Sequence, residues 1–282
     1  MKVLVAGAGG HVGRHTVDEL KRRGHWVRAL VRNTRDTWTE YPDEVVSADV
    51  NATPDVRPVC DGVDLIFSAI GGSLSLKSRD KTPYKVSDEI ANSNLLHGAI
   101  AANVRQFTYV SVYAHHALGD TAYVSAHESF IQRLRDARMD YQVLRPTGIF
   151  YVFGELLELA KKNRALVVGD GTARTNPVHE IDVAVAAVNL IESGDRELEI
   201  GGPDILSRAD LVRLAFQVLG KPDPRIRRIP QSLMRLAAFA TRPFNRRMAE
   251  LLEFGAAVSV TEVVAPTIGT RRPTDYFQEL AG

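Results

Sequence analysis

A short apolar segment that runs directly into a cluster of glycines limits what this chain can fold into. Residues 3–15 read VLVAGAGGHVGRH, with Gly7, Gly9, Gly10 and Gly13 inside seven positions. Glycine costs backbone entropy on folding, so a dense run indicates positive φ angles or a close approach of the backbone to another group. The spacing Gly7-x-x-Gly10-x-x-Gly13, between a predicted strand and a predicted helix, is typical of a turn that presents helix amides to phosphate. A glycine-rich turn that holds nothing is the alternative.

Predicted strands and helices then alternate along the chain. This alternation predicts right-handed βαβ units and a doubly wound, mostly parallel α/β sheet. The expected strands are residues 1–6, 25–32, 45–50, 63–70, 105–112, 140–146 and 196–203, and the expected helices of this part are 12–23, 83–103, 122–138 and 180–193.

The sequence pattern changes after Pro146. A helix near 154–163 is followed by the turn-rich stretch ALVVGDGTARTNPVH, which contains a short strand at 165–168. Ser207, with Asp210 three residues on, predicts a capping box at the start of another helix. Further helices are expected near 230–240 and 246–256.

Composition and charge exclude several classes of protein. With a net charge of +1 over 282 residues, no overall field favours nucleic acid. No apolar run is long enough for a membrane span, and no signal peptide is expected. The single cysteine, Cys60, rules out an internal disulfide and is predicted to be a small buried residue. These features predict a cytoplasmic protein.

The residue at the end of the second predicted strand bears on which dinucleotide the glycine turn would hold. Chains that bind NAD often carry an acidic residue there, which hydrogen-bonds the adenosine ribose. Arg32 takes that place here, and its guanidinium suits the 2′-phosphate of NADP. We therefore predict NADP (NADPH) as the cofactor. Its expected contacts at the carboxyl ends of the strands are Gly7, Gly10, His11, Val12, Gly13, Arg32, Asn33, Asp49, Ser68, Ala69, Ile70 and Pro146.

At this point the sequence resembles the NmrA-like group of NAD(P)-binding reductases, within the atypical short-chain dehydrogenases. The resemblance covers nearly the whole chain and is carried by VAGAGGHVGR, RALVRN, FTYVSV, YQVLRPTGIF, VVGDGTARTNPVHEIDVA and LEIGGPDILSRADLV. It implies a Rossmann sheet, a small C-terminal substrate region and NADP-dependent reduction of a small organic molecule. It also includes members that bind NADP without chemistry and act as redox sensors.

Short-chain dehydrogenases typically use a serine at the end of the fifth strand and a Tyr-x-x-x-Lys motif on the next helix. Ser111 and Tyr123 match, but His127 stands where the lysine is expected. We predict that Tyr123 donates a proton to the substrate, helped by His127. The alternative is that both are ordinary helix residues, so that solvent or Tyr113 supplies the proton.

The substrate pocket is expected beyond the fifth and sixth strands, and no metal is expected. The aromatic residues there would form apolar walls. Two polar candidates, Asn176 and His179, have turn and helix-cap roles as their alternative. The predicted lining is Tyr113, Thr147, Phe150, Tyr151, Phe153, Asn176 and His179.

The arginine-rich tail after residue 221 is predicted to be a lid over the substrate pocket. A helix that binds a partner or a membrane surface is the alternative.

Together these features predict an NADP-dependent reductase of a small, fairly apolar carbonyl, enone or quinone-like metabolite. The alternative function is a non-catalytic NADP-binding redox sensor that acts through a protein partner. We expect a monomer or homodimer in which residues 1–150, completed by 176–203, bind the dinucleotide. Residues 151–175 and 204–282 would form the smaller substrate-binding or lid region.

Overall fold

The computed structural model of the chain describes residues 1–32, 38–113, 115–222 and 224–282. Asn33, one of the residues that we expect to contact the cofactor, lies outside this part of the chain.

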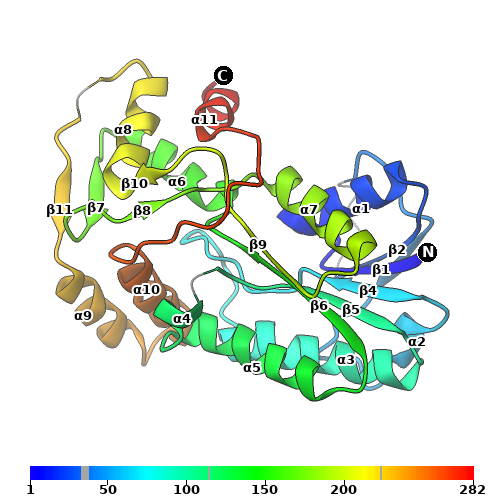
Figure 1. The fold of residues 1–282 in the computed structure, drawn as a ribbon. Helices are drawn as coiled ribbons and strands as arrows, with labels where there is room; N and C mark the ends of the chain where they lie inside the picture. The colour runs from blue at the N-terminus through cyan, green and yellow to red at the C-terminus, as the bar shows by residue number, and fades with distance from the viewer. Residues whose placement is uncertain (33–37, 114, 223) are drawn as a thin grey trace.

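Seven parallel strands form the central sheet (Figure 1). They are β1 (Lys2–Ala6), β2 (Trp26–Val31), β3 (Glu44–Ser47), β4 (Leu65–Ser68), β5 (Gln106–Val110), β6 (Asp140–Pro146) and β9 (Glu197–Ile200). Their order is β3-β2-β1-β4-β5-β6-β9, and every neighbouring pair is parallel. This confirms the expected doubly wound sheet of the Rossmann type. The order reverses at β1 and β4, and ligands bind at such a reversal, beyond the carboxyl ends of the strands.

Helices cover both faces of this sheet (Figure 1). On one face α1 (His11–Arg22) packs beside α7 (Glu180–Ser193). On the other lie α2 (Arg57–Cys60), α3 (Ala91–Ala101) and α5 (Ala122–Asp136). The single cysteine, Cys60, lies in this second layer. It is fully buried, as the sequence predicts.

The two covered faces explain why the strand sequences are apolar throughout rather than alternating. In β1, Val3 and Val5 belong to the core under α1 and α7, while Leu4 and Ala6 belong to the core under α3 and α5. All four side chains are fully buried.

Two helices differ from the expected ones. Residues 83–103 do not form one continuous α-helix, because a π-helical segment, Lys85–Ile90, precedes α3. The helix expected near 154 begins earlier, as α6 (Phe150–Lys161). Its start has no side-chain cap and is set instead by a long-range contact, since the Phe150 amide donates to the Val178 carbonyl.

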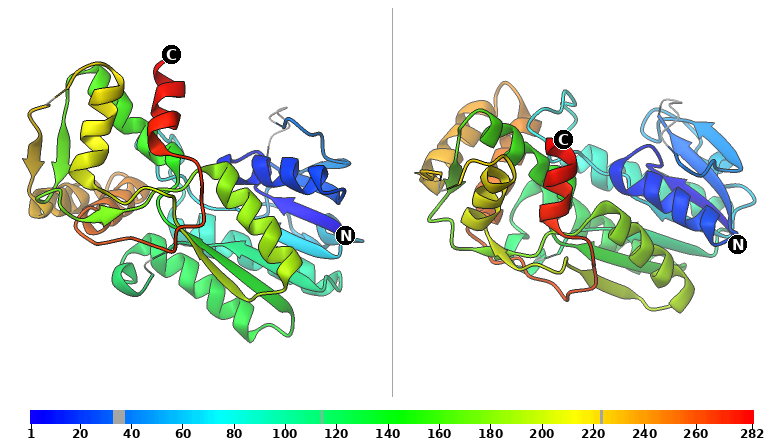
Figure 2. Two further views of the ribbon diagram at one scale, coloured as in Figure 1. Left: turned by 45° about the horizontal axis from the view of Figure 1, so that its top comes forward. Right: turned by 90° about the horizontal axis from the view of Figure 1, so that it is seen from above.

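The elements after β6 lie largely at one end of the sheet (Figure 2). A separate apolar core joins α6 to α8 (Arg208–Val218) and to the C-terminal helix α11 (Pro273–Ala281), which is red in Figure 2. The predicted capping box of α8 is confirmed, because Ser207 and Asp210 accept hydrogen bonds from each other's amides. The remaining elements of this region are β7 (Leu166–Val168), β8 (Arg174–Thr175), β10 (Leu206–Ser207), β11 (Arg227–Ile229), α9 (Gln231–Thr241) and α10 (Arg246–Val258).

Candidate functional site

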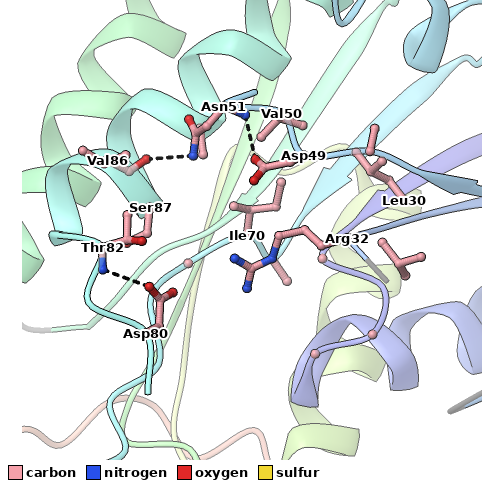
Figure 3. A pocket seen from close by; sticks show the side chains of 18 residues that line it. Leu30, Arg32, Asp49, Val50, Asn51, Ile70, Asp80, Thr82, Val86 and Ser87 are labelled. Carbon is pink, nitrogen blue, oxygen red and sulfur yellow. Dashed lines mark hydrogen bonds between the residues drawn. The ribbon is translucent and has the colours of Figure 1, made fainter. Parts of the chain in front are cut away.

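A cavity of about 630 Å³ lies at the carboxyl ends of β1 to β4, where the strand order reverses (Figure 3). Six of the residues predicted to contact the cofactor line it: Gly7, Gly10, Arg32, Asp49, Ala69 and Ile70. The cavity thus coincides with the position expected for a dinucleotide in a sheet of this kind.

The glycine loop leaves no room for side chains at two of its positions. Gly7 has a φ of +77°, and a Cβ on it would lie 2.9 Å from the Ala69 carbonyl oxygen. A Cβ on Gly13 would lie 2.1 Å from the Gly7 carbonyl oxygen. These contacts hold α1 tightly against the end of β1, and Gly10, directly before the helix, lines the cavity.

The first amides of α1 form the part of the loop that suits phosphate. Gly10 is the N-cap of the helix and supplies no capping side chain. Its own amide donates to the Gly7 carbonyl at 2.9 Å, so it is engaged inside the loop. The following amides, at His11 and Val12, begin a helix whose dipole favours an anion. A pyrophosphate fits this end of the cavity.

The far end of the cavity carries a cation. Arg32 follows β2, and its guanidinium points into the cavity in Figure 3. Asp49 lies across from it after β3 and accepts a hydrogen bond from the Asn51 amide at 2.9 Å. A phosphate on an adenosine ribose would meet the guanidinium here, because a planar cation pairs well with phosphate oxygens.

The segment between β4 and the π-helical turn closes one side of the cavity, and the sequence reasoning missed it. Asp80, Thr82, Val86 and Ser87 all line the cavity. The available signal is its length: residues 69–84 have no apolar periodicity, and long irregular connections are often functional. Burial opposes ionisation of Asp80, but hydrogen bonds from Thr82 and the charges of Arg247 and Arg32 bring its pKa below the ordinary value.

Arg247 of α10 holds this segment from the other side. Its Nη1 donates to the Thr82 carbonyl at 2.9 Å and its Nη2 to the Ser73 carbonyl at 2.6 Å. The guanidinium also lies 3.6 Å from the centre of the Tyr84 ring, and the residue is only 3% exposed. Unlike the exposed arginines of the arginine-rich tail, Arg247 is therefore a buried part of this wall.

Two residues predicted to contact the cofactor use their polar groups in hydrogen bonds within the protein. Ser68 is fully buried, and its hydroxyl donates to Asn92 Oδ1 at 2.5 Å. The Pro146 carbonyl accepts from the Tyr113 amide at 2.9 Å. Both residues support the strand ends around the site.

None of the three residues of the predicted catalytic group lines this cavity or a second one between α6 and α11. Ser111 is buried, and its hydroxyl accepts a long hydrogen bond of 3.4 Å from Arg145. His127 is 4% exposed, and its Nδ1 lies 2.5 Å from the Tyr109 hydroxyl. Its Nε2 lies 3.3 Å from Asp88 Oδ1, without hydrogen-bond geometry. Thus both ring nitrogens of His127 face the interior of the protein.

Tyr123 is packed among other aromatic rings. Its ring centre lies 4.6 Å from that of His127, 4.7 Å from that of Phe254 and 4.9 Å from that of Tyr84. Burial, followed by the charge of Asp88, raises the pKa of Tyr123 well above its ordinary value. The phenol therefore stays protonated at neutral pH, but no lysine lies beside it to make it a stronger acid.

A second cavity, of about 320 Å³, lies between α6, α11 and residues 73–77. His11 and Tyr151 stack in this cavity with ring centres 4.2 Å apart and planes 2° apart. Tyr276 and Leu280 add apolar surface from α11. One predicted substrate residue, Tyr151, therefore lies at the junction between the glycine loop and this second cavity.

The other predicted substrate residues line neither cavity and have structural contacts instead. Thr147 donates to the Asn176 carbonyl, and the Asn176 side chain bonds the backbone of Gly202 and Ala265. His179 caps α7 by accepting from the Ile181 amide. Asn176 and His179 thus take the turn and cap positions that the sequence left as their alternative. Of the remaining three, Phe150 is buried against His179 and Tyr276, Phe153 packs in the core of α6, and Tyr113 lies in the apolar cluster that contains Tyr123.

The described residues show neither a metal site nor a membrane-spanning helix. They contain no group of three or more histidine, cysteine, aspartate or glutamate side chains placed to hold a metal ion. Among the helices that the structure describes, we find none with the length and apolar character that crossing a membrane requires.

The chain is similar to two groups of proteins by sequence. It is 28% identical to the chloroplastic divinyl chlorophyllide a 8-vinyl-reductase of Zea mays, over 82% of this chain and 62% of the maize protein. It thus spans less than two thirds of that relative. It is also 22% identical to the photosystem II assembly factor Ycf39 of Trieres chinensis, over 92% of this chain and 82% of that protein.

A solved structure supports the fold, and a family model identifies the family. The UDP-glucose 4-epimerase of Thermotoga maritima superposes with a TM-score of 0.68 at 18% identity, covering 92% of this chain and 98% of the epimerase. The NAD(P)H-binding family model matches residues 7–194, which include the glycine loop, Arg32 and all the strands of the main sheet from β2 to β6. The chain therefore belongs to the NAD(P)H-binding family.

Proposed function

We propose that this chain is an NADP-dependent reductase of a small, fairly apolar carbonyl, enone or quinone-like compound. The observation that carries the proposal is the Arg32 guanidinium, which points into the cavity beside the glycine loop (Figure 3). A bound NADPH supplies a hydride for such a reduction.

The start of α1 and the residues of the first cavity divide the binding of the cofactor between them. The start of α1, at His11 and Val12, holds the pyrophosphate by its amides and dipole. Arg32 pairs with the 2′-phosphate, and Asp49 lies beside the adenosine. Ala69 and Ile70 form the floor between these two ends. The tight Gly7–Ala69 approach fits this arrangement, because it removes side chains from the path of the dinucleotide.

The second cavity supports the choice of substrate class. Tyr151, Tyr276 and Leu280 give it apolar walls, next to the end of the glycine loop at His11. The maize relative is named as a vinyl-reductase, which favours reduction over other chemistry of the family. Tyr123 remains our proposed proton donor, with His127 as the residue that positions it.

The sequence-based division of the chain forms part of the same proposal. Residues 1–150, completed by 176–203, bind the cofactor, and residues 151–175 and 204–282 enclose the substrate. A single buried cysteine, whose pKa burial raises to about 12, suits a protein of the reducing cytoplasm. We expect a monomer or homodimer.

Calorimetric titration with NADPH and NADH tests the cofactor assignment. We expect NADPH to bind at least about tenfold more tightly, a difference of roughly 1.4 kcal/mol. Arg32→Ala should remove most of this preference. Arg138→Ala, which changes an exposed arginine just after α5, should keep it. Equal affinities for the two dinucleotides in the unmodified protein would contradict the assignment.

A second candidate function is an NADP-binding sensor without catalysis. It is favoured by the positions of Tyr123, which lines neither cavity, and of His127, which faces Tyr109 and Asp88. The similarity to a protein named as an assembly factor also supports it. A panel of ketones, enones and quinones distinguishes the two: substrate-dependent NADPH oxidation identifies a reductase. Tight NADPH binding with no oxidation on any compound favours the sensor.

A further inference from the structure

The helix α9 presents apolar side chains to solvent along its outer face. Leu233 is 55% exposed, Leu236 61% and Phe239 74%, and Phe244 in the following turn is 87% exposed. Leu233, Leu236 and Phe239 recur every three residues, which places them on neighbouring positions of the helix surface, and Phe244 follows just after the helix ends. An exposed apolar stripe of this length marks an interaction surface.

The inner face of the same helix accounts for its packing. Ala238 is fully buried, and Met234 is partly buried against α10, where it contacts the Gly255 position. Among the described residues, α9 packs against α10 on this side, whereas the apolar side chains on its outer face stay exposed. Such a helix is normally buried on all sides or lies against a second apolar phase.

Arginines predominate among the charged residues around the stripe. From residue 224 to residue 249 the sequence contains seven arginines and no aspartate or glutamate. Of these, Arg242 pairs with Glu253, Arg246 pairs with Glu250, and Arg247 is buried. Within the described residues the other four are exposed and make no ion pair: Arg225, Arg227, Arg228 and Arg235. Both β11 and α9 lie at the end of the molecule far from the N-terminus (Figure 1). This end therefore combines exposed phenyl and leucyl groups with uncompensated positive charge.

We propose that α9 and the turn at Phe244 dock on the surface of a lipid bilayer that contains anionic lipids. The Leu233, Leu236, Phe239 and Phe244 side chains enter the boundary between headgroups and acyl chains, and the arginines around them pair with lipid phosphates or carboxylates. This complementarity selects a bilayer over a protein partner, because a hydrophobic protein groove would not need a border of arginines. The helix lies in the surface and does not cross it.

Flotation of the purified full chain with lipid vesicles tests the docking. The vesicles are phosphatidylcholine alone, or an equal mixture of phosphatidylcholine and phosphatidylglycerol. We expect binding to the mixed vesicles only, decreasing as salt is raised because surface charges are screened. The affinity of the double variant Phe239→Ser/Phe244→Ser for the mixed vesicles should be at least about tenfold lower. Arg235→Glu should also lower this affinity.

The matched controls change similar groups elsewhere. Ile100→Ser removes an aliphatic side chain of 48% exposure from α3, and Arg138→Glu reverses an exposed arginine after α5. Both should bind vesicles as the unmodified chain does. All the substituted side chains are exposed, so circular dichroism and NADPH affinity should be unchanged in every variant.

Three results would overturn the proposal. Absence of binding to mixed vesicles excludes an anionic surface as the occupant. If the phenylalanine variant binds the mixed vesicles as well as the unmodified chain does, another face of the protein makes the contact. The third result is a sedimentation experiment in which the unmodified chain is a dimer and the phenylalanine variant is a monomer. That result would assign the stripe to a contact with a second copy of the chain.

Discussion

Gly10 and Gly13 lack a side chain for different physical reasons, although they belong to the same loop. A methyl group on Gly13 would lie 2.1 Å from the Gly7 carbonyl oxygen, which belongs to the backbone and cannot move aside. A methyl group on Gly10 would lie 3.2 Å from the same oxygen, a contact that a small adjustment relieves. Packing inside the loop therefore requires glycine at position 13 but not at position 10, where the missing side chain can serve a ligand instead.

This difference predicts opposite results for two alanine variants. Gly10→Ala should remain folded, with the free energy of unfolding changed by less than about 1 kcal/mol, and lose NADPH affinity. Gly13→Ala should lose about 1–3 kcal/mol of stability, because α1 must move away from the loop. Chemical denaturation and NADPH titration of both variants measure the two effects. A folded Gly10→Ala variant that binds NADPH normally would show that the loop is only a turn.

The phenol of Tyr123 and the imidazole of His127 pack together, which permits a test of the proposed proton donor. Tyr123→Phe should lower turnover about 10²- to 10⁴-fold and leave NADPH affinity nearly unchanged, because the ring packing is kept. His127→Gln should lower turnover less, since it alters only the group that positions the tyrosine. Steady-state kinetics with an active compound from the panel gives both values.

The matching control is Tyr113→Phe, the alternative proton donor. If Tyr113→Phe loses turnover and Tyr123→Phe does not, the donor is Tyr113. If neither variant loses turnover, the proton comes from solvent or from another group.

At the level of single elements, α7 begins with a cap that titrates. The His179 Nδ1 accepts a hydrogen bond from the Ile181 amide at 3.0 Å, which requires that nitrogen to be unprotonated. Burial, followed by the charge of Arg271, lowers the pKa of His179 to about 4. In the unfolded chain the pKa returns to its ordinary value near 6.5.

Stability should therefore fall as the pH decreases from about 6.5 towards 4. In this window the unfolded chain takes up a proton at His179 that the folded chain does not, so protonation favours unfolding. His179→Asn keeps an acceptor at the N-cap and removes the titration. Urea denaturation at about pH 7.5 and about pH 5 should show a smaller loss of stability in the variant. An equal loss in both proteins would assign the pH dependence to other groups, such as His11 and His15, whose pKa values burial also lowers.

On the scale of the whole molecule, Arg247 connects the C-terminal helices to the cofactor cavity. It is buried, and it donates to two carbonyls of the segment that lines the cavity, at Ser73 and Thr82. Glu250, one turn later on α10, accepts from the Tyr84 amide at 3.0 Å. Residues more than 160 positions apart in the sequence thus fix one wall of the proposed NADPH site.

Arg247→Met should weaken both folding and cofactor binding. It leaves two half-buried carbonyls without their donor, which costs up to about 1–3 kcal/mol each in stability, and it loosens residues 73–87. We expect NADPH affinity to fall about tenfold, because the wall of the site is no longer positioned. Titration and hydrogen exchange of residues 73–87 measure these effects.

Arg246→Met is the matched control, because the neighbouring arginine is exposed and pairs with Glu250 on its own helix. Its effect on stability should stay below about 1 kcal/mol, with unchanged NADPH affinity. An Arg247→Met protein with normal affinity and normal exchange would show that the segment holds its position without α10.

Local sequence patterns were sufficient for much of the framework. The strand β6 and the helix α7 have the predicted bounds, since each is a long segment with a clear apolar pattern. The glycine loop, Arg32 and Asp49 could be placed at one cavity because parallel strands bring their carboxyl ends to the same edge of a sheet. In contrast, β8 and β10 have two residues each, and no periodicity exists over so short a length.

The sequence by itself determined the parallel sheet, its glycine loop and the cation at the end of β2, because each depends on neighbours close in the chain. Only the tertiary structure decided how the side chains of motif residues are used. His127 matches a motif position, yet its partners are Tyr109 on β5 and Asp88 before α3. Arg247 looks like one of many surface arginines, yet it is buried against Ser73 and Thr82. Such contacts depend on which segments the fold brings together, and a local pattern carries no record of them.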